Sequence, residues 1–348
     1  MKTWFIKNQF ALINAIKTAL ASLIGYIAGS WLAFFLDEPR MFSWIVITIV
    51  VIMAAQPHMG GAISKALSRA WGTVIGVAAG IGIILMFHAH PTIVITAAII
   101  LIALSTYFAI TLPKYSYIGV LSAVTIAMVA LSQQTSVKFA IDRGLEVLLG
   151  FVIAIIVIRF IWPIKASNRI HRSFAKSLSD MQKFHANLLT HSLDQAIISD
   201  IFDQFSKQLA LIEQMNYEIS AKKRDDLKQI AYLIRRLYRY ICVSYEYIDY
   251  YPDKRQRFAN DPHFQKLQQH INAILKMLSD GFLMKTSVSM SYFQEYQTLI
   301  DDYMKHMKME ASSRHASTLV FATTTLAHTL QMLITLQQKV YIPATIKK

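Results

Sequence analysis

Four ionisable side chains stand inside long apolar stretches of this 348-residue sequence. Lys17 interrupts the first stretch, Arg69 and Arg143 stand near the starts of two others, and Glu146 follows Arg143 by three positions. A charge at the centre of a membrane helix costs about 2.5–3.5 kcal/mol on insertion scales, so such residues are functional candidates. Arginine offers a bidentate fork for a carboxylate, and Glu146 shares a helix face with Arg143. The pattern favours a basic path for a small organic anion, with Glu146 as the proton-titrating partner.

A structural role for these side chains stays open. Arg69 and Arg143 could extend their charged ends to lipid headgroups, and Arg143 with Glu146 could form a purely structural pair. Lysine would then replace either arginine without loss.

The segment Gln56-Pro57-His58-Met59-Gly60-Gly61 is the most irregular one at membrane depth. Broken backbone there must line a cavity or lie buried in protein, so we add Gln56 and Pro57 to the candidate substrate path. His58 titrates near neutral pH and joins Glu146 as a proton-coupling candidate. An ordinary cytoplasmic turn is the alternative.

A second pattern concerns glycine. Gly72, Gly76 and Gly80 follow one another at four-residue spacing, and Gly150 stands in a later apolar stretch. Small residues at this spacing are typical of close packing between membrane helices. We predict a packing role for all four.

These residues need elements to position them. A membrane helix takes about 20 mostly apolar residues, and six stretches qualify: about 10–36, 41–57, 66–87, 92–112, 116–132 and 143–162. Lys and Arg are more frequent in the connections that would face the cytoplasm. The sequence therefore predicts six spans, with the N-terminus and the C-terminal tail in the cytoplasm.

The spans form a repeat. A shift of 74 positions brings Pro39 onto Pro113, Arg69 onto Arg143 and Gly76 onto Gly150. The repeat units are about 10–87 and 92–162. Each holds three helices, and an odd number inverts the second copy, which is typical of secondary transporters. Arg69 is then expected to begin its helix on the cytoplasmic side and Arg143 on the far side.

The composition separates two domains. Hydrophobic residues make up 54% of the chain and charged residues 16%, against about 25% charged in average soluble domains. Residues 1–163 hold 10 of the 35 Lys and Arg and 4 of the 21 Asp and Glu. We predict a transmembrane domain over 1–163 and a cytoplasmic helical bundle over 164–348. The net charge of +14 fits basic residues flanking a bilayer rather than a nucleic-acid partner.

No nucleophile elbow, phosphate loop or zinc spacing is present in the sequence, so we predict no enzyme, no cofactor and no metal site. In the tail, periodicity predicts helices near 165–192, 195–221, 224–251, 260–282, 286–311 and 315–340. Residues 315–338 lack charged side chains but are rich in Thr and Gln, which favours a buried bundle helix over a seventh span. The run Lys222-Lys223-Arg224 is interpreted as a solvated turn, with contact to anionic headgroups as the alternative.

The motif Arg69-Ala-Trp-Gly72-Thr73-Val-Ile-Gly76 resembles the signature of the fusaric acid resistance and aromatic acid exporter family. Arg143-Gly-Leu-Glu146-Val-Leu-Leu-Gly150, followed by Ile161-Trp162-Pro163, is similar to the last span of that family, and Lys17 matches a basic residue of its first span. The resemblance covers about 1–165. More distantly, the plan is similar to plant aluminium-activated malate transporters, which are anion channels.

The resemblance implies an all-α membrane protein of the bacterial inner membrane that exports aromatic carboxylates, coupled to protons. Many family members contain two six-span blocks where this chain has one, which implies a homodimer. The other partners implied are the organic anion, membrane lipid and a periplasmic adaptor subunit. A passive anion channel and a non-transporting membrane scaffold are the alternatives.

Overall fold

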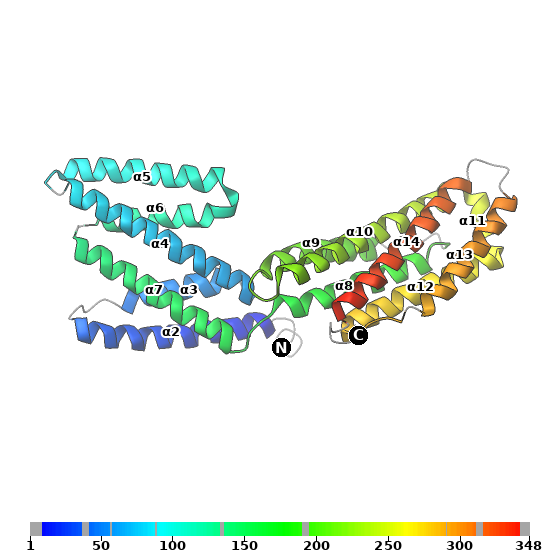
Figure 1. Cartoon of the computed structure of the whole chain (residues 1–348), viewed down its shortest axis with the longest axis horizontal. Helices are drawn as coiled ribbons and strands as arrows, with labels where there is room; N and C mark the ends of the chain where they lie inside the picture. The colour runs from blue at the N-terminus through cyan, green and yellow to red at the C-terminus, as the bar shows by residue number, and fades with distance from the viewer. Residues whose placement is uncertain are drawn as a thin grey trace. The chain divides into compact units, whose positions relative to one another are not determined.

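The computed structural model describes residues 9–36, 42–55, 58–87, 89–132, 136–189, 195–289, 291–310 and 316–341. Over these residues the chain forms helices and no strand (Figure 1). It divides into two compact units between Lys165 and Ala166. Each unit is described by itself.

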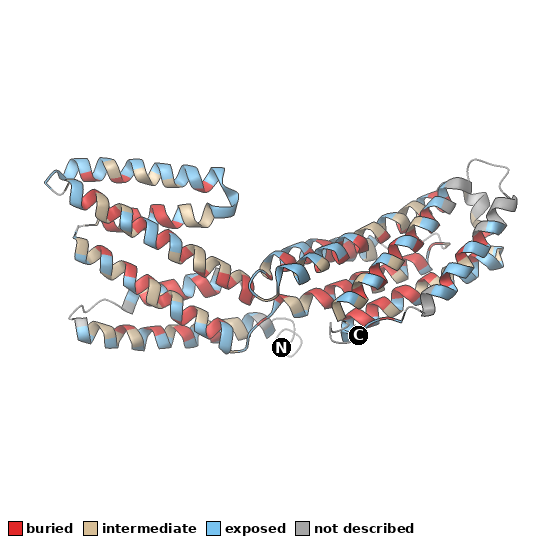
Figure 2. Ribbon diagram, in the orientation of Figure 1, coloured by how far each residue is buried: buried red, intermediate tan, exposed pale blue. Residues whose placement is uncertain are grey.

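The first unit contains the apolar helices: α2 (Gln9–Leu36), α3 (Phe42–Ala55), α4 (Met59–Phe87), α5 (Pro91–Thr111), the 3-10 turn η1 (Pro113–Tyr115), α6 (Ser116–Ala130) and α7 (Val137–Phe160). Many of their large apolar side chains face outward, so that α5 is exposed along much of its length (Figure 2). A water-soluble unit would bury such side chains, whereas lipid tails cover them without cost.

Four segments in the described part of the chain are long and apolar enough to cross a membrane: Ala11–Phe35, Met59–Phe87, Pro91–Thr111 and Pro113–Ala130. Helix α3 is apolar but short, with Ser43–Ala54 as its apolar part. Helix α7 is 24 residues long but includes Lys138, Asp142, Arg143, Glu146 and Arg159. The expectation of six spans therefore stays a prediction for α3 and α7.

In this unit, helices of one repeat pack against helices of the other, an arrangement here called helix exchange. By the 74-residue shift, α2, α3 and α4 correspond to α5, α6 and α7. The third helix of each repeat packs against the second helix of the other: α4 on α6, and α7 on α3. Helices α4 and α7 also contact each other, and they run in opposite directions in Figure 1.

Two predicted helix starts are wrong. Helix α4 begins at Met59 rather than near 66, and α7 begins at Val137 rather than at 143. Gly60 and Gly61 continue the helix, and the Ser136 hydroxyl accepts a hydrogen bond from Phe139 N and so caps α7. At about 1.5 Å per residue, Arg69 lies about 15 Å inside α4 and Arg143 about 9 Å inside α7. Neither arginine opens its helix.

The second unit is a helical bundle: α8 (Ala166–Ala186), α9 (Gln195–Gln214), α10 (Ala221–Tyr250), α11 (Pro252–Asn260), α12 (Pro262–Met284), α13 (Ser291–Glu310) and α14 (Ala316–Tyr341). Its core is one continuous cluster. Amphipathic spacing explains this core, because α10 buries Ile230, Ile234, Leu237 and Ile241 from one face.

Three details of this bundle bear on the predictions. Helix α11 is additional, because Pro252 and Pro262 each stand in the first turn of a helix, where proline is well tolerated. Helix α10 begins at Ala221, after the capping residue Ser220. The run Lys222–Arg224 therefore belongs to the first turn of α10 rather than to a turn between helices, although Lys222 and Lys223 are solvent-exposed as expected. Helix α14 adds Leu326, Leu330 and Leu333 to the core, as expected of a bundle helix.

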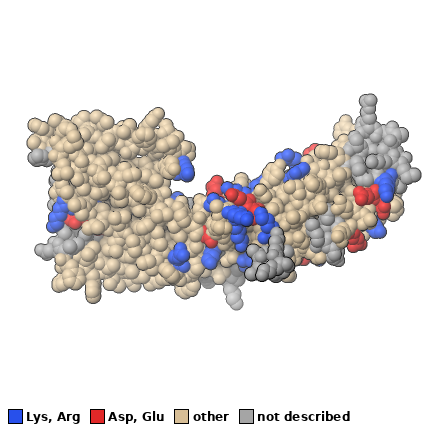
Figure 3. All heavy atoms as spheres, viewed as in Figure 1, with Lys and Arg blue, Asp and Glu red and all other residues tan. Residues whose placement is uncertain are grey.

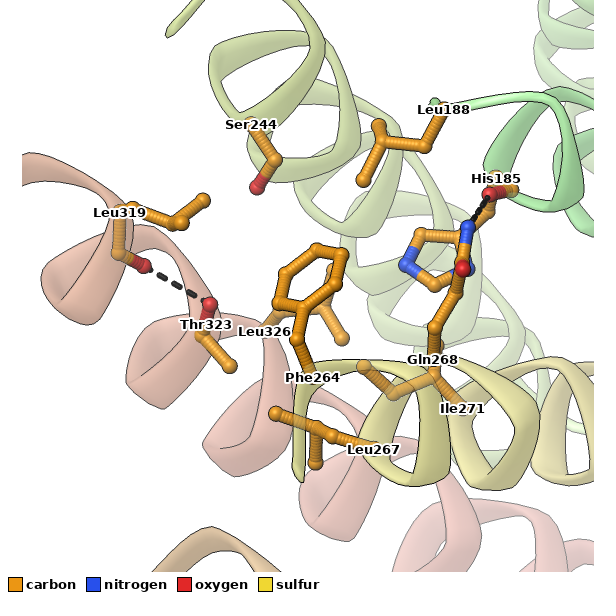
Figure 4. A pocket seen from close by; sticks show the side chains of 10 residues that line it. All are labelled: His185, Leu188, Ser244, Phe264, Leu267, Gln268, Ile271, Leu319, Thr323 and Leu326. Atoms are coloured by element: carbon orange, nitrogen blue, oxygen red, sulfur yellow. Dashed lines mark hydrogen bonds between the residues drawn. The ribbon is translucent and has the colours of Figure 1, made fainter. Parts of the chain in front are cut away.

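The cavity that Figure 4 shows in this core lies between α8, α10, α12 and α14. Its polar lining includes His185, Ser244 and Thr323 among leucine and phenylalanine side chains. It has room for roughly one water molecule, so it is too small for an organic ligand.

Candidate functional site

Helix α3 brings the two repeated arginines to one place. Arg69 Nη2 on α4 donates a hydrogen bond to Thr48 Oγ1 at 3.4 Å. The guanidinium carbon of Arg143 on α7 lies 5.6 Å from the centre of the Trp44 ring. Trp44 and Thr48 are one helical turn, about 6 Å, apart on α3. The structure therefore assembles a polar cluster between α3, α4 and α7.

Arg143 is held by a carboxylate and by aromatic rings. Its Nη1 lies 2.6 Å from Glu146 Oε2, and the Glu146 side chain is 1% exposed. Its guanidinium carbon also lies 4.8 Å from the centre of the Phe139 ring. Cations bind the faces of such rings by electrostatic attraction. Arg143 and Glu146 thus form a charge-neutral pair at the α3–α7 contact.

Arg69 has a different environment. It is 7% exposed, and its neighbours are the hydroxyls of Thr48 and Tyr117. Among the described residues no carboxylate lies within ion-pair distance of Arg69, and its Nε has no hydrogen-bond partner. A buried charge normally requires a partner of opposite sign. The cluster around Arg69 therefore carries an uncompensated positive charge.

Lys65 adds to that charge. It lies one turn before Arg69 on α4, and its Nζ is 5.6 Å from the centre of the Tyr117 ring. Tyr117 on α6 thus contacts both basic side chains of α4. An aromatic face thus lies beside two positive charges at this place.

The structure does not bring Lys17 into this cluster. Its side chain is 3% exposed, and its Nζ donates a hydrogen bond to the carbonyl of Trp162 at 3.3 Å. Trp162 follows the end of α7, whereas Glu146 lies 16 positions earlier, about 24 Å along a helix. A cation at a helix C-terminus is favourable, so Lys17 caps α7 in this structure.

The irregular segment before α4 lies near the same end. Met59 N donates to the carbonyl of Ile164 at 3.0 Å, which ties the start of α4 to the chain after α7. His58 precedes this contact and is buried. Gln56 and Pro57 lie outside the described residues.

The glycines of α4 face α6. A Cβ atom built on Gly72, Gly76 or Gly80 would lie 2.7, 2.5 or 2.6 Å from the nearest atom of Leu121, Thr125 or Val129, respectively. Any side chain would push the two helices apart, so the backbones approach as closely as they do because these residues are glycines.

Gly150 has the equivalent position on α7. A Cβ atom there would lie 2.8 Å from the carbonyl oxygen of Ile45 and 2.9 Å from Thr48 Cβ. Thr48 is fully buried and so lies between the Gly150 backbone and the Arg69 guanidinium. The close approach of α7 fixes the hydroxyl that Arg69 uses.

A separate cavity of about 430 Å³ opens where α4 and α6 end and α5 begins. The side chains that line it are apolar, Ile84, Val94 and Ile95 among them, except for the hydroxyl of Ser132. None of the basic cluster residues lines it.

A model of the fusaric acid resistance protein family matches residues 11–341 of the chain. The chain belongs to this family. The match includes the second unit, beyond the 1–165 over which the sequence motifs show the resemblance. The chain is also 25% identical over 224 residues to the inner membrane protein YeeA of Escherichia coli (strain K12).

That alignment covers 63% of this chain and 61% of YeeA, so the chain spans about three fifths of the length of this curated relative. The name of the relative places it in the inner membrane. Together with the apolar helices, the family shows that this chain is a membrane protein.

The sequence alone did not indicate which side chains lie next to Arg69 and Arg143. Trp44, Thr48 and Tyr117 read as ordinary residues of apolar spans, and only the folded structure brings them to the arginines. Lys65 had a usable signal, since it stands four positions before Arg69 and therefore on the same helix face.

Proposed function

We propose that the chain is a subunit of an inner-membrane efflux transporter for small organic anions, aromatic carboxylates among them, coupled to protons. The observation that carries the proposal is Arg69, which is buried without a carboxylate partner among the described residues. A substrate carboxylate would supply the missing charge and accept two hydrogen bonds from the fork of the guanidinium.

Glu146 links this site to pH. It neutralises Arg143, one turn of α3 away from Arg69. A proton taken up by Glu146 raises the charge of the cluster by one, so proton and anion occupancy are thermodynamically coupled. The sign of that coupling is found by comparing anion flux before and after the pH gradient is reversed.

The test is flux of a labelled aromatic carboxylate in proteoliposomes, with and without a pH gradient. Arg69→Gln should abolish flux while the protein stays folded, and Arg69→Lys should rescue only part, because a point charge lacks the bidentate fork. Arg159→Gln is the matched control, since Arg159 is an exposed arginine of α7.

Other outcomes select the alternatives. Voltage-driven current that is indifferent to the pH gradient would identify a passive anion channel. If the Arg69 and Arg143 variants lose flux equally, and only in proportion to the loss of folded protein, the chain is a non-transporting membrane scaffold.

We further propose six spans with both ends of the chain in the cytoplasm. The opposite directions of α4 and α7 (Figure 1) and the helix exchange between the repeats support an inverted repeat. Reporter fusions after Lys114 and Lys348 should report cytoplasm, and one near His90 the outside. An outward C-terminus contradicts this topology.

We also propose a homodimer, because the chain has a single six-helix block. The purified protein should run as a dimer in detergent, and an active particle that is strictly monomeric would refute the dimer.

A further inference from the structure

One end of the second unit is strongly basic. The first two turns of α8, the first turn of α10 and the residue after α12 carry six Lys and Arg side chains, here called the basic end: Arg169, Arg172, Lys222, Lys223, Arg224 and Lys285. Blue side chains gather over this part of the bundle in Figure 3, with some acidic ones among them.

Specific contacts assemble the basic end from distant parts of the sequence. The Glu218 carboxylate accepts hydrogen bonds from Ala166 N at 2.9 Å and Ser167 N at 3.0 Å, which ties the loop before α10 to the start of α8. Lys285 Nζ donates to Asn168 Oδ1 at 2.7 Å, which brings the end of α12 to the same place.

Nearby acids offset only part of this charge. Asp225 pairs with Lys228 at 3.5 Å, and Asp226 pairs with Lys339 at 2.6 Å. Both pairs are neutral and use basic residues outside the set. Three acidic side chains remain at this end among the described residues: Glu213 in the last turn of α9, Glu218, which accepts hydrogen bonds from the start of α8, and Asp280 one turn before the end of α12. Six positive charges thus stand against three negative charges, which leaves the basic end with an excess of positive charge.

Apolar side chains project beside these charges. Leu283 is 55% exposed and Met284 is 70% exposed, and both directly precede Lys285. Lys285 has a φ of 60° and ends α12 in the left-handed conformation. Exposed apolar side chains next to basic ones are typical of surfaces that lie at a membrane interface.

A short connection joins α7 to the first helix of the basic end. Helix α7 ends at Phe160 and α8 begins at Ala166, so the intervening segment spans at most about 20 Å even when fully extended. Phe160 and Trp162, at the exit from α7, are exposed aromatics of the kind found at membrane–water interfaces.

We propose that the basic end docks on the anionic phospholipid headgroups of the leaflet that the C-terminal end of α7 reaches, with Leu283 and Met284 entering the interface. Clusters of four to eight Lys or Arg beside a membrane helix bind anionic lipid in this way. The docking is independent of any transported substrate. It would make the second unit sensitive to the lipid composition of the membrane.

The test uses the full chain in nanodiscs, either of phosphatidylcholine alone or with phosphatidylglycerol, in a Cys242→Ser background. A fluorophore is attached at Met284→Cys, and quenching by lipids brominated on their acyl chains is measured. Tyr250→Cys provides the matched control, since Tyr250 is 78% exposed at the opposite end of α10 from Lys222.

The probe at position 284 should be quenched in discs with phosphatidylglycerol, and less in phosphatidylcholine or at 0.5 M salt, where charges are screened within about 4 Å. The probe at 250 should stay unquenched. Equal quenching at both positions, or quenching at 284 that ignores lipid charge, would overturn the proposal.

A charge variant separates local docking from general attraction. Lys222→Gln, Lys223→Gln and Arg224→Gln together should lower the ratio of docked to undocked probe about fivefold for each charge removed. The control removes the same charge elsewhere, at the exposed Lys207, Lys266 and Lys305. If both triple variants reduce quenching alike, the basic end is not the docking surface.

Discussion

The Gly76→Ala substitution measures how tightly α4 packs against α6. An alanine Cβ at this position would lie 2.5 Å from Thr125 Cβ and 2.9 Å from the carbonyl oxygen of Ser122. Carbon atoms in contact settle about 3.5–4.0 Å apart, so the helices must separate by roughly 1 Å. The carbonyl belongs to the backbone and cannot rotate out of the way.

The magnitude follows from two opposing effects. Overpacking of this kind costs about 1–3 kcal/mol, while alanine is more favourable than glycine inside a helix by about 0.5–1 kcal/mol. Gly82→Ala on the same helix is the control, because nothing lies within 4 Å of its built Cβ. It should gain the helix term alone.

The assay is reversible unfolding of both variants in mixed detergent micelles, followed by helicity. Gly76→Ala should be less stable than Gly82→Ala by about 1–3 kcal/mol, which is the overpacking cost alone. If the two variants have the same free energy of unfolding, α4 and α6 are not packed as closely as the structure has them.

Three further changes have defined outcomes. Glu146→Gln should destabilise the membrane unit by about 3 kcal/mol in detergent unfolding, because it leaves the partly buried Arg143 charge without its carboxylate partner. Adding Arg143→Gln should restore most of the loss, and a double variant as unstable as the single one would contradict a paired charge. Burial lowers the pKa of His185 to about 4, so below about pH 6.5 the unfolded chain binds a proton that the folded chain does not. The contribution of His185 to stability is therefore complete above pH 6.5 and is lost as the pH is lowered, by about 2–3 kcal/mol at pH 4.5. Hydrogen exchange of α8 should become faster at this pH, and the change should be smaller in His185→Gln. Lys17→Met removes the hydrogen bond to the chain after α7, at about 1 kcal/mol, so trypsin should cleave after Lys165 faster than in Lys17→Arg; equal rates would show that the cap does not hold this exit.

Local patterns in the sequence predicted what depends on a single helix. The three-residue spacing of Arg143 and Glu146 predicts a shared face, and the two side chains form an ion pair. The four-residue spacing of the α4 glycines likewise predicts one face, and that face lies against α6. Both results need only the helical repeat of about 3.6 residues.

Contacts between helices could not be predicted in the same way. Thr48 binds Arg69 because α3 lies beside α4 and because Gly150 lets α7 approach, and no local pattern contains that information. Helix starts were misplaced for another reason. Hydropathy marks the apolar part of a helix, whereas the helix itself begins at a capping residue such as Ser136, outside the apolar stretch.

The exchange of α4 and α7 between the repeats has a consequence for how the membrane unit is made. When α4 enters the membrane, the partner of its glycine face has not yet been synthesised, because α6 follows more than twenty residues later. Helix α3 likewise waits for α7. The two repeats are therefore interlaced, because the third helix of each repeat packs against the second helix of the other. Folding of this unit must finish after the last helix has emerged, rather than proceed one repeat at a time.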